Sequence, residues 1–263
     1  MNDAHIAAAS DLLIGHWRAG TVLPALPDGL RPASRAEAYA IQARLETTSA
    51  APLRGWKIAA TSAAGQAHIG VDGPMTGRLL AEMVQGDGAT LPFGANRMAV
   101  AEAEFVFRMA RDLEPRATPW TMEEVLGAVA GLHLGIEVPA SRFGDFVTAG
   151  AAQLIADNAC AHQFVLGPEV PRDWRGMDLA AHTVTGRVSS GLEREGRGAN
   201  VLGDPRIALT WLANELSRHG VTLAAGQFVT TGTCLVPLEV APGDAVLADF
   251  GVLGRVGLRF GGN

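Results

Sequence analysis

The sequence predicts an α+β fold, a mixed β-roll or distorted barrel with flanking helices and a small helical region at the N-terminal end. Two observations support this prediction. Apolar residues recur at helical spacing in the first fifty residues, whereas short apolar runs separated by Gly- and Pro-containing turns follow from residue 54 onward. From residue 227 to the end the pattern is strands and turns, which is typical of a β-roll or barrel.

A chain of 263 residues is long enough for one large domain, or for a small domain joined to a larger one. The change from helical to strand periodicity suggests where such a division falls. We expect an N-terminal helical or mixed region over 1–84 and a β-roll domain over 85–263, in which the candidate functional residues described below mostly lie.

Composition and charge exclude several classes of partner. The chain is 48% hydrophobic and 18% charged with a net charge of −6, and it has no run of Lys and Arg for phosphate binding. We therefore expect a small-molecule partner and no nucleic acid. Two distant cysteines, Cys160 and Cys234, indicate reduced thiols rather than a zinc or redox motif. No leader-like segment and no apolar run of about 18 residues is present, so a cytoplasmic protein without a membrane partner is expected.

The N-terminal part of the chain contains clear helix signals. Ser34 followed by Glu37 has the form of a capping box, and Pro and Gly residues separate it from the first apolar-periodic segment. The expected elements are a helix over 3–18, a helix from 34 to 44 or 46, a strand over 54–61, a short helix over 62–70 and a turn-rich segment over 71–77.

Strand patterns dominate the rest of the chain, with a few helices between them. Thr121 and Glu124 form another capping box, and Asp204 with Pro205 has the form of a helix start. The expected elements are strands over 99–109 and 131–138, a helix from 121 to about 131, a helix over 146–155, strands over 163–167 and 183–190, an exposed charged turn over 191–198, a helix from 204 to 217, and strands from 227 onward.

Two carboxylates in the strand over 99–109 are the first candidates for a site. Side chains alternate along a strand, so Glu102 and Glu104 fall on one face, and they repel each other unless a positive charge lies between them. Glu137 at the end of a second apolar run offers a third carboxylate. Such a set suits Mg²⁺ or Mn²⁺. The alternative is a solvated edge strand whose polar face carries Glu102, Glu104 and Arg108.

Lys57 is the candidate for proton transfer. It lies between Trp56 and Ile58 in a largely apolar segment, where burial lowers the pKa of an ammonium group toward neutrality. The alternative is an exposed lysine that reaches solvent along its aliphatic stem.

Six motifs, in order and spacing, resemble the 2-keto-4-pentenoate hydratase and 4-oxalocrotonate decarboxylase family of the fumarylacetoacetate hydrolase superfamily. They are GWKIAATSAAGQAHIGVDGPMTGRLL, AEAEFVFRM, GLHLGIEV, LIADNACAHQFVLG, NVLGDPRIALTWLANEL and GQFVTTGTCLVPLEVAPGDAVLADFGVLGRVGLRF. The resemblance covers the chain from about residue 54 to residue 260. It implies a fumarylacetoacetate hydrolase-like fold, a homo-oligomer and a bound Mg²⁺ or Mn²⁺.

The resemblance also implies roles for individual residues. Metal ligands fall on Glu102, Glu104 and Glu137, and the proton carrier falls on Lys57. The remaining candidates are Asp72 as a second catalytic residue, and Asp157, Asn158, Thr231, Gly232 and Thr233 near the substrate.

The sequence departs from the family pattern at two places. Ala103 replaces a Pro between the paired glutamates, and keeps the strand alternation. Met75 replaces a family acid that follows the lysine strand, so the proton partner of Lys57 is open; Asp72 matches the earlier acid of that motif.

The family activity that we expect first is hydration of a 2-hydroxy-2,4-dienoate in the catabolism of aromatic or related compounds, giving a 4-hydroxy-2-oxo acid. Decarboxylation of a 2-oxo-3-enedioate is the main alternative, because both reactions pass through the same dienolate and because Met75 stands where the hydratases of the family carry an acid. A cation such as Arg78 or Arg142 placed to hold a second carboxylate would favour the decarboxylase. Hydrolysis of an acylpyruvate and a non-catalytic binding role are further alternatives.

Overall fold

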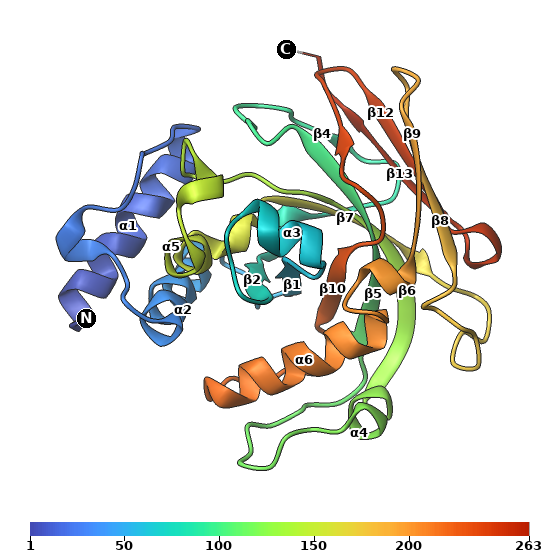
Figure 1. Ribbon diagram of the computed structural model, residues 1–263, viewed down its shortest axis with the longest axis horizontal. Coiled ribbons are helices and arrows are strands. Elements are labelled where there is room, and N and C mark those ends of the chain that lie inside the picture. The colour runs from blue at the N-terminus through green and yellow to red at the C-terminus, as the bar shows by residue number, and fades with distance from the viewer. Residues whose placement is uncertain (263) are drawn as a thin grey trace.

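The structure is a computed structural model that describes residues 1–262 (Figure 1). Two β-sheets lie side by side, and the helices α1, α2 and α5 gather beside the end of the larger sheet that is remote from the smaller one. The α+β fold expected from the sequence is confirmed, with a strongly bent larger sheet in place of a flat one.

The larger sheet has eight strands and mixed pairing. Its order is β2-β1-β10-β5-β6-β7-β3, with β11 paired to β5. The bounds are β1 Gly55–Ala59, β2 Met75–Leu79, β3 Val84–Gly86, β5 Val100–Met109, β6 Val129–Val138, β7 Gln163–Glu169, β10 Phe228–Thr233 and β11 Leu238–Glu239. Strands β5 and β6 are the longest and lie at its centre, so both of their faces are covered.

The smaller sheet has five strands in the order β4-β13-β12-β8-β9. The bounds are β4 Thr90–Leu91, β8 Thr183–Val188, β9 Glu193–Arg197, β12 Ala245–Asp249 and β13 Arg255–Phe260. The charged segment over 191–198 was expected to be an exposed turn. That prediction is wrong, because the segment contains β9. Charged side chains of β9 alternate toward solvent, and Glu193 pairs with Arg187 of β8 across this sheet edge.

The helices begin and end at the residues that local chemistry favours. Ser34 caps α2 by accepting from the Glu37 amide, and Asp204 with Pro205 starts α6. The bounds are α1 Asp3–Ala19, α2 Arg35–Ala43, α3 Ala63–His68, α4 Met122–Leu126, α5 Ala151–Ala156 and α6 Pro205–Arg218. Within residues 1–262, none of these helices combines the length and the apolar character that a membrane crossing needs.

Three other boundaries differ from the expectation. The helix that starts at the Thr121–Glu124 capping box ends at Leu126 instead of residue 131, because β6 begins at Val129. The helix expected from 146 begins at Ala151, after a separate single turn over Phe146–Thr148. The segment over 71–77 is not all turn, since its last residues open β2.

The apolar core fills the space between the two sheets. Phe105 of β5 is fully buried and its ring lies 5.2 Å from that of Phe250, which follows β12. Phe107 packs in the same way against Trp174 at 5.5 Å. Because β5 alternates, Phe105 and Phe107 face this core while Glu102 and Glu104 face the other side of the sheet.

The larger sheet spans the boundary expected at residue 84. Strands β1 and β2 precede that residue, yet β1 pairs in parallel with β10 near the other end of the chain. The two cysteines, Cys160 and Cys234, are buried and free, as expected from their spacing.

Removing the Phe105 ring is expected to destabilise the protein strongly, because this side chain joins the two sheets. We expect Phe105→Ala to lower the free energy of unfolding by about 3–5 kcal/mol, from lost burial and the cavity that remains. Urea unfolding measures the change. Val236→Ala is the control, since its side chain is 65% exposed, and a change within about 0.5 kcal/mol is expected there. A loss below about 1 kcal/mol for Phe105→Ala would contradict this role of the ring in the core.

Candidate metal centre and active site

Three carboxylates meet on one face of the β5–β6 pair. In the antiparallel register Glu102 lies opposite Glu137, and Glu104 follows two residues along on the same face. One oxygen of each residue lies within 4.8 Å of the others, with Glu104 and Glu137 buried and Glu102 half-buried. The strand pattern therefore brings together the three residues that the sequence predicted as metal ligands.

Hydrogen bonds fix one oxygen of Glu104 and leave other oxygens of the cluster without donors. The backbone amide of Gly232 donates to Glu104 Oε2 at 2.7 Å, and the Thr230 hydroxyl donates to the same oxygen. Among residues 1–262, no donor reaches Glu104 Oε1 or Glu137 Oε2, although both atoms are buried. Buried acceptors without donors are costly, and a hard divalent cation among them satisfies them. The residues present therefore fit Mg²⁺ or Mn²⁺.

Lys57 lies directly beside the carboxylates. Its side chain is 3% exposed, and Nζ lies 3.0 Å from Glu137 Oε1. The ammonium also donates to the Ala159 carbonyl at 2.8 Å. The structure therefore contains neither of the two alternatives that the sequence left open, an exposed lysine and a solvated edge strand.

Charge and burial shift the pKa values of the whole cluster. Burial and the repulsion of Glu137 raise the pKa of Glu102 to about 7, and burial raises the pKa of Glu104 well above its ordinary range. Burial by itself lowers the pKa of Lys57, but the carboxylates, Glu137 first, outweigh it and raise that pKa. The expectation of a lowered pKa for Lys57 is therefore wrong for the metal-free protein, because its surroundings are anionic rather than apolar.

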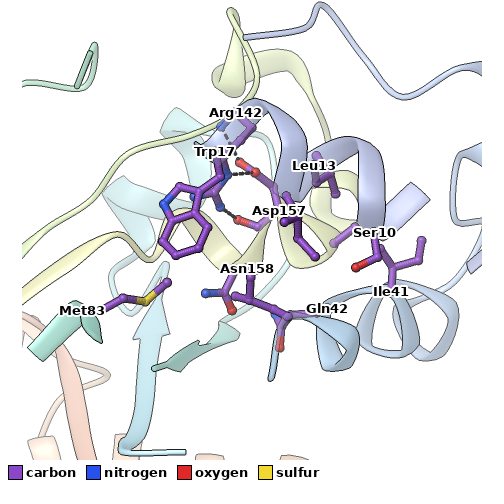
Figure 2. Close-up of a pocket in the computed structure, with 12 residues that line it drawn as sticks. Ser10, Leu13, Trp17, Ile41, Gln42, Met83, Arg142, Asp157 and Asn158 are labelled. Atoms are coloured by element: carbon purple, nitrogen blue, oxygen red, sulfur yellow. Dashed lines mark hydrogen bonds and ion pairs between the residues drawn. The ribbon is translucent and has the colours of Figure 1, made fainter. Parts of the chain in front are cut away.

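Both side-chain oxygens of Asp157 are engaged by neighbouring protein groups. It accepts from the Ser141 hydroxyl at 2.6 Å and from the Arg142 amide at 3.0 Å, and it forms an ion pair with the Arg142 guanidinium (Figure 2). Figure 2 shows that it lines a cavity with Asn158 and residues of α1 and α2. The cavity has a volume of about 20 Å³. That volume suits about one water molecule. None of the three clustered glutamates lines this cavity.

Asn158 is close to the cluster through its backbone, but its side chain is used elsewhere. The amide oxygen accepts from the Arg78 backbone N–H at 2.6 Å, and the amide nitrogen donates to the Arg78 carbonyl at 2.9 Å. The residue that contacts Lys57 is the next one, Ala159. A direct role for Asp157 and Asn158 in substrate binding stays a prediction.

The segment over 231–233 lies against Glu104 of the cluster. Only Gly232 contacts the cluster, through its amide; the Thr231 hydroxyl donates to the Phe105 carbonyl and the Thr233 hydroxyl to the Leu235 carbonyl. Gly232 has φ +101°, and a Cβ there would clash with Oγ1 of Thr61. Glycine is therefore required for this amide to reach Glu104.

The structure does not bring the second catalytic candidate into the cluster. Asp72 lies on an exposed loop between α3 and β2, and within the described chain it makes no ion pair. Met75 is buried at the start of β2, opposite Ala59 in the register that sets Gly77 opposite Lys57. An apolar side chain therefore lies on the same face as Lys57, two residues further along.

Arg78 and Arg142, the two cations considered for a second substrate carboxylate, both have protein partners. Arg78 pairs with Glu46, donates to Gln42 and lies 4.7 Å over the Trp56 ring. Arg142 is bound to Asp157. Using either cation for a substrate requires breaking a buried contact.

Sequence reasoning missed two features of the site. Thr230 and the Ala159 carbonyl are invisible to motif reading, because their roles depend on how distant segments meet. A signal for Lys57 was present: it is the only lysine of the chain, and every other residue among the 21 Lys and Arg residues is arginine. Since the chain uses arginine at every other basic position, the single lysine indicates a position that needs an ammonium group.

Comparison with known proteins agrees with this geometry. Residues 74–260 match the family described as "Fumarylacetoacetate (FAA) hydrolase C-terminal". A 2-keto-4-pentenoate hydratase of Burkholderia vietnamiensis is 33% identical over 262 residues, covering 98% of each chain. A 2-oxo-hept-4-ene-1,7-dioate hydratase of Escherichia coli is 30% identical over 234 residues, covering 85% of this chain and 86% of the relative.

A solved structure resembles the whole chain. The 4-oxalocrotonate decarboxylase from Pseudomonas putida G7, complexed with magnesium and adipate, has a TM-score of 0.89 at 25% identity, covering 99% of this chain and 98% of the other. Fold and relatives thus define an enzyme, and its cluster of carboxylates has the composition of a divalent-cation site. The chain belongs to the fumarylacetoacetate hydrolase family, and the resemblance drawn from its sequence is confirmed.

The raised carboxyl pKa values predict how Mg²⁺ affects stability. The pKa of Glu102 is about 7 in the metal-free fold against an ordinary value of 4.5, so the fold binds more protons than the unfolded chain between these values. Stability of the metal-free protein therefore falls as pH rises through this range. Mg²⁺ binds the ionised carboxylates, so we expect it to stabilise the protein more at pH 8 than at pH 5.5. At 100 times its Kd the gain is about 2.7 kcal/mol.

Thermal unfolding with and without Mg²⁺ at both pH values measures this difference. Glu104→Gln is the control variant, because the amide keeps the size of the side chain and removes a charged ligand. We expect it to remain folded and to show little Mg²⁺-dependent shift in Tm. An equal shift at both pH values in the parent protein, or an undiminished shift in Glu104→Gln, would contradict the assignment of these carboxylates as ligands.

Proposed function

We propose that the chain is a divalent-metal-dependent hydratase that adds water to a 2-hydroxy-2,4-dienoate and gives a 4-hydroxy-2-oxo acid. The observation that carries this proposal is the cluster itself: three carboxylates converging beside the only lysine of the protein. Its relatives of similar length, named 2-keto-4-pentenoate hydratase, support the choice of substrate class. A role in aromatic catabolism, a cytoplasmic location and a homo-oligomer stay predictions.

The chemistry needs negative charge to be stabilised and protons to be moved. A bound Mg²⁺ or Mn²⁺ would be held by Glu102, Glu104 and Glu137 and would supply a Lewis acid for the oxygens of the 2-oxo acid group. Thr230 and the Gly232 amide hold Glu104 in place, so that it does not reorient as charge develops.

Lys57 is proposed to carry the protons. In the first half of the reaction a proton is added at the far carbon of the dienol and the proton of the 2-hydroxyl is lost, which leaves an α,β-unsaturated ketone. Water then adds across the double bond: its oxygen bonds to C4, one of its protons is removed, and a proton is delivered to C3. Lys57 is the group that delivers and accepts protons at the 2-hydroxyl and at the carbon atoms of the substrate. Its ammonium is suited to this because it is held beside the carboxylates and is shielded from solvent.

Decarboxylation of a 2-oxo-3-enedioate is the second candidate function. The likeness to 4-oxalocrotonate decarboxylase, at a TM-score of 0.89, favours it. The absence of the family acid at Met75 also favours it, whereas one observation counts against it: Arg78 and Arg142, the cations considered for a second carboxylate, are both held by protein partners. A substrate without a second carboxylate suits these surroundings better.

An ultraviolet assay with Mg²⁺ on 2-hydroxypenta-2,4-dienoate and on 2-oxohex-3-enedioate tests the proposal directly. We expect consumption of the first substrate and a product heavier by one water in the mass spectrum. Loss of CO₂ from the second substrate, with no hydration of the first, would replace the proposal by the decarboxylase. Absence of turnover on both would leave a binding role.

Replacing Lys57 by Met is expected to remove turnover while leaving metal binding in place. Met keeps most of the apolar volume and removes the only group proposed to carry protons, so kcat is expected to fall by about 10²-fold or more. Steady-state kinetics gives kcat, and calorimetric titration with Mg²⁺ gives the affinity for the metal. Full activity in Lys57→Met would remove this role, and loss of Mg²⁺ binding would show that the lysine is needed for the metal site itself.

A further inference from the structure

The outer edge of β2 is completed by side chains rather than by another strand. Strand β2 lies at the end of the larger sheet, and the peptide groups of Thr76 and Arg78 point away from β1. The Thr76 amide donates to Tyr39 Oη at 3.3 Å, and Gln42 Nε2 donates to the Thr76 carbonyl at 2.8 Å. The carboxamide of Asn158 binds both polar groups of the Arg78 backbone. Asn158 thus takes the place of a residue of a neighbouring strand.

Asn158 also begins a turn of unusual backbone conformation. The φ values of Asn158, Ala159 and Cys160 are +55°, +48° and +61°, a region that residues other than glycine seldom adopt. Three such residues in succession persist only where the surrounding structure fixes them, and such conformations cluster at functional sites. The Asn158 carboxamide and the cross-link by Gln42 provide this fixation from the side of β2.

Gln42 connects the same elements one step away. Its Nε2 donates to the Ile155 carbonyl of α5 at 2.8 Å as well as to the Thr76 carbonyl of β2 at 2.8 Å, and it is 1% exposed. Helix α5 leads directly into the turn over 158–160. One buried side chain from the N-terminal region therefore ties the turn to β2.

The two segments that Gln42 connects, β2 and the turn over 158–160, both contact Lys57. The Thr76 hydroxyl donates to the Lys57 carbonyl at 3.0 Å, and the Lys57 ammonium donates to the Ala159 carbonyl at 2.8 Å. Contact between the turn and the strand is close: a Cβ on Gly77 would clash with the Asn158 carbonyl oxygen and lie 3.1 Å from Lys57 Cγ. The position of the ammonium thus depends on how the turn sits on β2.

We infer that Asn158 and Gln42 are positioning residues for Lys57: they hold the turn over 158–160 against β2, so that the Ala159 carbonyl keeps the ammonium directed at the carboxylates. The inference rests on the proposed function only in taking Lys57 as the proton carrier. It assigns to Asn158 a role through its neighbour rather than contact with the substrate.

Asn158→Gly is the decisive variant, because glycine adopts the positive φ without strain and only the carboxamide is lost. We expect kcat to fall about 10–100-fold, since small misplacement of a reacting group has effects of this size, while KM and the Kd for Mg²⁺ change less than about 3-fold. Gln42→Met, nearly the same size, is the second variant, with an expected fall of about 10-fold in kcat. It keeps the test open if Asn158→Gly does not fold.

Gln153→Met is the matched control. Gln153 is a glutamine of α5 that accepts from the Leu26 amide and donates to the Ala149 carbonyl, and neither hydrogen bond involves β2. We expect it to lower Tm and to leave kcat within about 2-fold. An equal fall in kcat in Gln153→Met would show that any loosening of the N-terminal region has this effect, and would overturn the inference.

A spectroscopic measurement tests the positioning without turnover. Because the chain has one lysine, labelling with [ε-¹³C]lysine gives a single Cε signal in the full-length protein loaded with Mg²⁺. We expect two distinct Hε resonances in the parent protein, from a side chain held in one orientation, and one averaged resonance in Asn158→Gly and Gln42→Met. If the parent protein converts neither substrate, the proposed function fails while this measurement still decides the positioning.

Two further results would overturn the inference. One is an Asn158→Gly protein whose Hε resonances and kcat match those of the parent. The other is an Asn158→Gly protein with unchanged kcat and a Michaelis constant raised by about 10-fold or more, which is the result expected if the Asn158 side chain binds the substrate directly.

Discussion

Repulsion among three carboxylates that converge inside the protein is the constraint on which the rest of the structure depends. Glu102, Glu104 and Glu137 approach within 4.8 Å, and a single ammonium, that of Lys57, lies among them. One positive charge does not balance three negative charges, and burial removes the water that would screen them. Raised carboxyl pKa values are the direct consequence in the metal-free protein. A divalent cation would remove this repulsion. The cluster that destabilises the metal-free fold is therefore also the place of its proposed chemistry.

The two-sided strand β5 makes such a cluster tolerable. On one face it carries the glutamates, and on the other it carries Phe105 and Phe107, which are fully buried between the sheets. Burial of large aromatic side chains contributes free energy that offsets the cost of the acidic face. The donors on Glu104 come from β10, the strand that pairs with β5, so the same sheet that carries this glutamate also orients it.

The N-terminal helices are part of the site's support rather than an appendage. Their side chains complete the outer edge of β2 and contact α5, which precedes the turn that holds Lys57. Tyr39 of α2 is one of the side chains that contact the outer edge of β2. Its pKa is raised to about 12 by burial and by the nearby Glu215 carboxylate. It therefore stays a neutral hydroxyl that accepts from the Thr76 amide at ordinary pH.

The sequence alone determined the class of the fold, most of the elements and the acidic triad. Period-two alternation is local, so it places Glu102 and Glu104 on one face whatever the rest of the chain does, and the order of motifs identified the family. Only the tertiary structure decided what surrounds these residues: that Lys57 is ion-paired, so that its pKa rises instead of falling, that Asp72 stays outside the cluster, and that the charged segment over 191–198 forms an edge strand. These outcomes depend on contacts between residues more than fifty positions apart or on pairing with another strand. The burial of a side chain and the electric field at it are set by neighbours that are distant in sequence. A local sequence pattern does not encode these neighbours.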